Sequence, residues 1–156
     1  MSLEDDGEPT AEQQLRELLE TLVEAFDIDA DVVTTATDDE LRGAVEGPGA
    51  ETLVGSGGQV LEAVQHLAQR IVVPGAGGLR IVVDAAGYRG RREEALREEA
   101  DRAADRALSE GQEVALRPMP ATERRFVHEY LRERGDVGTH SEGDEPRRRL
   151  VVSPEL

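Results

Sequence analysis

A glycine-rich turn that leads directly into an amphipathic helix constrains this chain more than any other feature. The turn is Gly55-Ser56-Gly57-Gly58, and apolar residues at helical spacing continue from it to Ile71. Glycines let the backbone turn tightly and approach another molecule closely. The start of the helix offers unpaired N–H groups and the positive end of the helix dipole. A turn of this kind indicates an anion site, most often for phosphate.

Three phosphate-binding motifs share this description, and the sequence argues against two of them. The Walker loop ends in a lysine, and this chain contains no lysine. The dinucleotide fingerprint G-x-G-x-x-G lacks its third glycine, because Val60 stands there. The third motif is the GXXG loop of a KH domain, which clamps a nucleic-acid backbone. Residues 55–58 fit that spacing, although a plain interhelical turn remains the alternative on the motif alone.

The composition favours one or two small domains without a membrane segment, metal or cofactor. The chain has 156 residues, no cysteine, three histidines and four aromatic residues. Without cysteine there can be no disulfide or thiolate metal site, and the scattered histidines lack zinc-binding spacing. No apolar run is long enough to span a bilayer, and the acidic N-terminus is unlike a signal peptide. We therefore expect a cytoplasmic protein that does not insert into membranes.

The charge is strongly acidic but unevenly distributed. The formal net charge is −16, which by itself argues against binding to nucleic acid. Residues 1–88 carry 4 arginines and 18 acidic residues, whereas residues 89–156 carry 14 arginines and 16 acidic residues. Because charges beyond about 8 Å are largely screened at physiological salt, a local arginine cluster in the second part can still bind an anion.

The apolar periodicity predicts an α+β protein of two small modules after a disordered segment at 1–10. Residues 11–86 follow the order α-β-β-α-α-β, a KH domain of type II-like topology whose three-stranded sheet carries helices on one face. Residues 87–154 combine two helices with short strands, which predicts helices packed on a small sheet. The expected helices cover 11–26, 59–72, 89–109 and 121–134, with a short helical turn at 50–54. The expected strands cover 30–37, 40–46, 79–84, 114–117, 137–141 and 148–153.

The helix at 121–134 carries an arginine and a histidine separated by three residues, Arg124 and His128. At about 100° per residue, we expect these two side chains to share one side with Arg125 and Arg132, opposite the apolar side. Such a basic strip suits contacts to a phosphate backbone. An ordinary solvated helix face is the alternative, since charge runs often only solvate.

The order of these parts resembles the bacterial Jag family, whose members are also called SpoIIIJ-associated proteins or KhpB. After the GXXG unit, the resemblance rests on GYRGRREEALREEADRAADRALSEG, then VALRPMPATERRFVHEYL, then RRRLVVSP, and it extends from Ala11 to Pro154. The family joins a KH domain to an R-three-H domain, which is named for an arginine and a histidine separated by three residues. The resemblance implies binding of RNA or single-stranded DNA without catalysis.

The resemblance also implies which residues bind RNA and which partners to expect. It implies an RNA-level regulator linked to cell elongation and division, with a small single-KH partner protein or self-association. Basic residues found inside the loop of many members are replaced here by Ser56 and Gly57. A protein-interaction module with the same fold and little RNA affinity is therefore the alternative. The expected RNA-binding residues are Gly55, Ser56, Gly57, Gly58, Gln59, Arg124, Arg125, His128 and Arg132.

Overall fold

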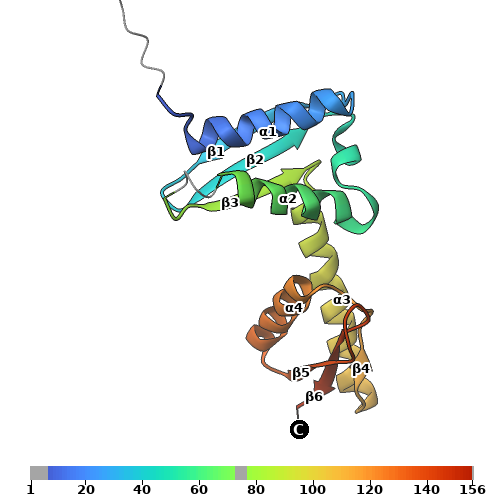
Figure 1. Ribbon diagram of the computed structural model, residues 1–156. Coiled ribbons are helices and arrows are strands. Elements are labelled where there is room, and N and C mark those ends of the chain that lie inside the picture. Colours follow the sequence, from blue (N-terminus) through green and yellow to red (C-terminus); the bar gives the residue numbers. More distant parts are fainter. Residues whose placement is uncertain (1–6, 73–76, 156) are drawn as a thin grey trace, which may run out of the picture. The chain divides into compact units, whose positions relative to one another are not determined.

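The structure is a computed structural model that describes residues 7–72 and 77–155. The chain divides into two compact units, Met1–Arg89 and Gly90–Leu156, each containing a three-stranded sheet (Figure 1). The sequence predicted the division at Gly87. Of the segment predicted to be disordered, residues 1–6 lie outside the described part of the chain, and residues 7–10 are exposed and belong to no helix or strand.

The first unit has the predicted order of elements, with a 3-10 turn as the first of its two central helices. Its elements are α1 (Ala11–Ala25), β1 (Asp31–Ala36), β2 (Glu40–Glu46), the 3-10 helices η1 (Ala50–Leu53) and η2 (Ser56–Gly58), α2 (Gln59–Val72) and β3 (Arg80–Ala85). Helix α1 begins with a capping box, in which Thr10 Oγ1 accepts from the Gln13 backbone N–H and Gln13 Oε1 accepts from the Thr10 N–H.

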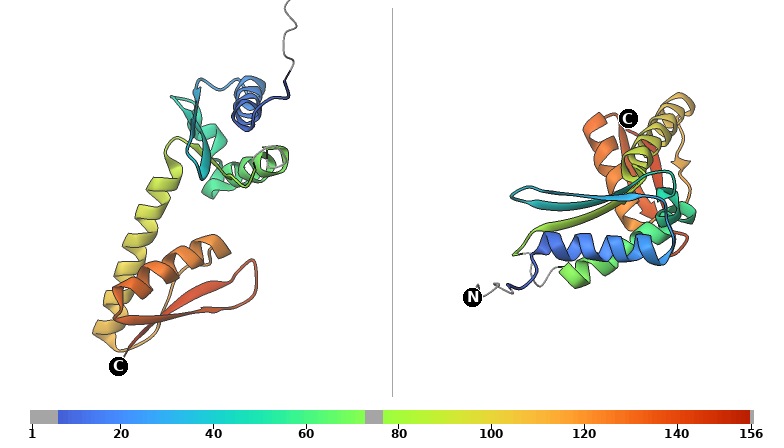
Figure 2. Two further views of the ribbon diagram at one scale, coloured as in Figure 1. Left: turned by 90° about the vertical axis from the view of Figure 1, so that its left-hand side faces the viewer. Right: turned by 90° about the horizontal axis from the view of Figure 1, so that it is seen from above.

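Both helices of the first unit cover one face of its sheet (Figure 2). The strand order is β1-β2-β3, with β1 antiparallel and β3 parallel to β2. The helix-facing residues of β2 are Leu41, Gly43 and Val45, as their alternation predicts. Gly43 lets α1 approach the sheet, because a Cβ there would lie 2.6 Å from the Leu19 Cδ1 atom. The α+β architecture predicted from the sequence is confirmed.

The outer edge of β3 is closed by side chains instead of by another strand. The Gln65 amide of α2 accepts from the Val83 N–H and donates to the Ile81 carbonyl, both at 2.7 Å. Arg89 Nε donates to the Val83 carbonyl, also at 2.7 Å. These bonds occupy backbone N–H and C=O groups that an exposed strand edge would leave free to pair with another chain. The two Gln65 bonds also fix the position of α2, and of the loop that precedes it, against the sheet.

Replacing Gln65 by leucine is expected to destabilise the protein by about 1–3 kcal/mol, because the buried Val83 N–H and the Ile81 carbonyl lose their partners. Urea denaturation followed by circular dichroism measures this loss. Gln69→Leu is the matched control, since Gln69 lies one turn further along α2 and its exposed side chain makes no hydrogen bond to a described residue. Equal stability of the two variants would contradict a structural role for the Gln65 amide.

The second unit packs two helices against a small antiparallel sheet of order β4-β6-β5. Its elements are α3 (Tyr88–Glu110), which starts at the end of the first unit, then β4 (Val114–Ala115), α4 (Ala121–Arg134), β5 (Val137–Glu142) and β6 (Arg149–Pro154). Alanines of α3 let the other elements approach closely and share a core with apolar residues of α4, β5 and β6. The buried members are Leu96, Ala100, Ala103, Ala104, Ala107, Met119, Val127, Leu131, Val137, Leu150 and Val152.

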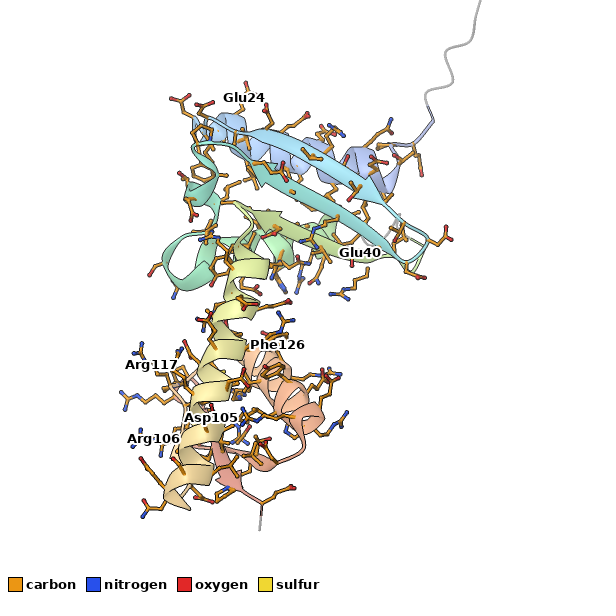
Figure 3. The ribbon with its side chains drawn as sticks, turned by 180° about the vertical axis from the view of Figure 1, so that it is seen from behind. Glu24, Glu40, Asp105, Arg106, Arg117 and Phe126 are labelled. Carbon is orange, nitrogen blue, oxygen red and sulfur yellow. The ribbon has the colours of Figure 1, made fainter. Side chains whose placement is uncertain are left out.

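Polar contacts fasten α4 to α3. Arg134 of α4 bonds to Asp101 and Asp105 of α3 and to Asp136, and the hydrogen bond to Asp105 contributes most to raising the pKa of Arg134. The Tyr130 hydroxyl donates to Asp101, which raises the pKa of Tyr130. Near the other end of α4, the labelled Phe126 side chain lies beside α3 (Figure 3), where Arg97 stacks on its ring at 5.3 Å from the centroid. These contacts determine which side of α4 packs against α3 and which side remains exposed.

Candidate nucleic-acid interface

The GXXG loop, residues 55–58, is a tight turn that delivers the chain into α2. Gly55, Gly57 and Gly58 all have positive φ, between 61° and 80°, a conformation that residues with a Cβ adopt at a cost. The base of the loop is closed by the Val54 carbonyl, which accepts from the N–H groups of both Val60 and Leu61. The sequence therefore predicted the turn correctly, and the glycines there serve a backbone conformation.

Tyr88 packs against the loop, a contact that nothing in the local sequence indicates. A Cβ on Gly58 would lie 2.8 Å from the Tyr88 ring and hydroxyl, so the ring rests directly on the backbone of the loop. Gly55 is closed in by the Val60 side chain in the same way. Gly57 alone of the three faces open space, since a Cβ added there would have nothing within 4 Å. The loop is thus closely packed at both ends and open at its tip.

The open tip presents backbone donors and no cation. Among the described residues, the N–H groups of Ser56 and Gly57 have no hydrogen-bond acceptor, and both residues are exposed together with Gln59. These donors lie at the start of α2, where the helix dipole adds positive potential. Neutral donors at a helix start can bind a phosphate, with a weaker dependence on salt than arginine contacts would give.

A depression of about 450 Å³ lies between α4 and the hairpin of β5 and β6. We call it the basic depression, because three arginines and two histidines but no acidic residue line it within the described part of the chain. Its lining residues are Ala121, Arg124, Arg125, His128, Thr139, His140, Ser141, Arg148 and Leu150. Its arginines offer an anion local donors in a chain of net charge −16, although two of them also pair with acids just outside the lining, Arg124 with Glu145 and Arg125 with Glu129.

The expectation that Arg124 lies on the solvated side of α4 is wrong. Arg124 is buried, with 8 % of its surface exposed. The physical reason is helical geometry: Arg124 and Leu131 are seven residues apart, which places them within about 20° on the helix, and Leu131 is fully buried. The guanidinium of Arg124 donates from Nη1 to the Met119 carbonyl at 2.7 Å and from Nη2 to the Glu145 carboxylate at 2.6 Å.

The other predicted residues of α4 are exposed, and two of them line the basic depression. His128 Nδ1 forms a hydrogen bond with Thr139 Oγ1, which ties the imidazole to β5. Arg125 is 80 % exposed and pairs with Glu129 one turn along the helix. Arg132 is also exposed but does not line the basic depression. The structure therefore brings Arg124, Arg125 and His128 together and leaves Arg132 outside.

Sequence reasoning missed the strand side of the basic depression. Arg148, Thr139 and His140 come from the β5–β6 hairpin, and the sequence assigned no role to His140. The arginine run at the start of the last predicted strand was an available signal for Arg148. The hairpin pairs Ser141 with Leu150, which brings Arg148 close to the start of α4, and that proximity is a tertiary feature.

In the described part of the chain, every helix is too short or too polar to span a membrane. The same residues include no cluster of three or more histidine, aspartate or glutamate side chains that could hold a metal ion.

Comparison with known proteins identifies relatives along most of the chain. The family model for the R-three-H domain matches residues 94–154, within the second unit. "RNA-binding protein KhpB" of Bacillus subtilis (strain 168) is 33 % identical over 144 residues, covering 90 % of this chain and 69 % of the relative. A protein of the same name from Clostridium symbiosum is 31 % identical and covers 92 % of this chain and 66 % of its own length. Another from Streptococcus pneumoniae serotype 2 is 28 % identical and covers 88 % of this chain and 42 % of its own length. The chain therefore belongs to the KhpB family and carries an R-three-H domain in its second unit, as its motifs predicted.

Proposed function

We propose that this protein binds single-stranded RNA, or single-stranded DNA, through two surfaces. The basic depression is the main electrostatic contact, and the GXXG loop is a neutral clamp of the KH type. The observation that carries the proposal is the acid-free lining of the basic depression within a strongly acidic chain. The relatives are named RNA-binding proteins, which supports the same ligand class.

The geometry of the basic depression suits phosphate groups better than base edges. Arg124, Arg125 and Arg148 supply charged donors, and arginine pairs with phosphate through its forked N–H groups. Among the described residues, no phenylalanine, tyrosine or tryptophan lines the basic depression, so base stacking contributes little there. We therefore infer backbone contacts with little base preference in the second unit.

The biological role is inferred from family resemblance. We infer a non-catalytic cytoplasmic regulator that acts on RNA and is linked to cell elongation and division. A small single-KH protein, or a second copy of this chain, is the protein partner that the resemblance suggests.

A protein-interaction module is the second candidate function. Helix α2 exposes Leu67 and Ile71 at 41 % and 43 %, one turn apart on one face of a helix whose preceding loop carries no cation. Apolar side chains in this position suit a protein partner better than RNA. The candidate predicts that the first unit contributes no RNA affinity.

Titration of a fluorescein-labelled single-stranded RNA, about ten nucleotides long, tests the proposed function by anisotropy over a salt series. We expect binding in the micromolar range. If about three arginines meet phosphates, log K falls with log salt with a slope of about −2. Absence of binding even at low salt would overturn the proposal in favour of the interaction module.

A further inference from the structure

The guanidinium of Arg124 donates hydrogen bonds to backbone carbonyls with one nitrogen and to a surface carboxylate with the other. Nη1 donates to backbone carbonyls, to Met119 at 2.7 Å and to Arg148 at 3.5 Å, which are part of the fold. Nη2 donates to the carboxylate of Glu145 at 2.6 Å. Glu145 lies in the turn between β5 and β6, and its side chain is 59 % exposed. One edge of a buried cation is therefore held by an acid that water can also solvate.

Glu145 supplies the anionic partner that the buried charge of Arg124 needs. A buried guanidinium without an anionic partner costs several kcal/mol, so Arg124 requires an acceptor whether or not a ligand is bound. Glu145 is not among the residues that line the basic depression, yet it bonds to an arginine that is. Carboxylate and phosphate oxygens accept from the same N–H groups of arginine with similar geometry.

We propose that Nη2 of Arg124 is a phosphate-binding subsite, which the Glu145 carboxylate occupies in the absence of RNA. A backbone phosphate of single-stranded RNA displaces this carboxylate when RNA binds. The inference rests on the proposed RNA-binding function and adds the position of one phosphate and its competitor. The exchange keeps the buried guanidinium paired at every stage. The released carboxylate returns to water, where its high exposure makes solvation easy. Glu145 thereby lowers RNA affinity and favours ligands that carry an anion over those that do not.

The test compares Glu145→Gln with Asp144→Asn in the full chain. Glutamine keeps an oxygen that can accept from Arg124 but removes the competing charge. Asp144→Asn removes the same charge from the neighbouring position of the same turn, where the exposed side chain makes no hydrogen bond or ion pair with a described residue. Anisotropy with the same labelled single-stranded RNA gives the affinities, and thermal melting by circular dichroism checks that both variants fold.

We expect Glu145→Gln to bind RNA about three- to fivefold more tightly than the unmodified chain, the range that an exposed ion pair of up to about 1 kcal/mol allows. Asp144→Asn should change affinity less than about twofold. The salt slope of Glu145→Gln should stay close to the value of about −2 expected for the unmodified chain, because Arg124 meets phosphate in both bound states.

The outcomes separate this inference from the proposed function on which it rests. RNA binding by all three proteins, with equal affinities for Glu145→Gln and Asp144→Asn, would overturn the phosphate subsite and leave the proposed function standing. Weaker binding by Glu145→Gln would also overturn it, since the carboxylate would then support the site and not compete for it. No binding by any of the three proteins would overturn the proposed function itself.

Discussion

Arg124→Ala is expected to destabilise the second unit by about 3 kcal/mol, because it leaves a cavity and a buried carbonyl without its donor. The substitution leaves the Met119 carbonyl without its donor at 2.7 Å and deprives Glu145 of its partner. It also opens a cavity on the side of α4 that carries Leu131, which is fully buried. Urea denaturation followed by circular dichroism, with amide exchange of the second unit as a local probe, measures the loss.

Arg125→Ala is the matched control, since it removes the same side chain from the next position of α4. Arg125 is 80 % exposed and makes only a surface pair with Glu129 among the described residues, so its loss should change stability by less than about 0.5 kcal/mol. The same variant should weaken RNA binding, because a cation leaves the basic depression. If Arg124→Ala and Arg125→Ala were equally stable, the buried contacts of Arg124 would have no stabilising role.

The contrast between these neighbours means that affinity alone cannot assign a role to Arg124. An alanine there removes a donor and also loosens the fold around it. Arg124→Lys separates the two effects in part, because lysine keeps the charge but not the forked geometry that reaches two acceptors. We expect its RNA affinity and stability to lie between those of Arg124→Ala and the unmodified chain.

The order of helices and strands could be predicted because its signals are local. Thr10 and Gln13 form the capping box that their spacing predicts. Gly135 ends α4 in a left-handed conformation, as a glycine after a periodic apolar run predicts. The β2 strand shows its period of two in the sequence and in its burial. Each of these features depends on residues within one or two turns of one another.

The candidate site could be predicted only in part, because its shape depends on contacts between distant segments. The sequence identified Arg124 and His128 as a pair but assigned Arg124 to the wrong side of α4. Glu145 and Tyr88 were missed altogether, since Glu145 reaches Arg124 across 21 positions and Tyr88 reaches Gly58 across the length of α2 and β3. No local pattern encodes either contact.

The distribution of charge shows how an acidic chain can present a site for an anion. Surface charges separated by more than about 8 Å are largely screened at physiological salt, so the net charge of −16 acts mainly on long-range approach. The lining of the basic depression carries no acidic residue, although just outside it Glu145 pairs with Arg124 and Glu129 pairs with Arg125. We therefore expect slow association at low salt relative to a basic protein, and an affinity set by local pairing.

The second large effect is expected at the tip of the GXXG loop, where Gly57→Asp should weaken RNA binding about fivefold or more. A carboxylate there stands beside the N–H donors of Ser56 and Gly57 and repels an approaching phosphate. Two like charges about 4 Å apart cost between about 1 kcal/mol in water and about 4 kcal/mol near a protein surface, and about 1.4 kcal/mol is a factor of ten. Anisotropy with labelled single-stranded RNA measures the change.

Gly57 is the right position because its surroundings are open, whereas a side chain on Gly58 would collide with the Tyr88 ring at 2.8 Å. Aspartate and asparagine both tolerate the left-handed backbone better than other residues. Gly57→Asn therefore carries the same strain without the charge, and it should bind RNA within about threefold of the unmodified chain.

Gly77→Asp completes the comparison by placing the same charge on the same unit, past the far end of α2. Gly77 has a φ of +58° and nothing within 4 Å of a Cβ, and α2 alone separates it from the loop by about 20 Å. That distance exceeds the screening length at physiological salt, so RNA affinity should be nearly unchanged. Equal weakening by Gly57→Asp and Gly77→Asp would mean that the charge of the unit matters and the loop does not. If Gly57→Asp bound RNA as well as Gly57→Asn does, the GXXG loop would not be a phosphate clamp, and RNA affinity would reside in the basic depression alone.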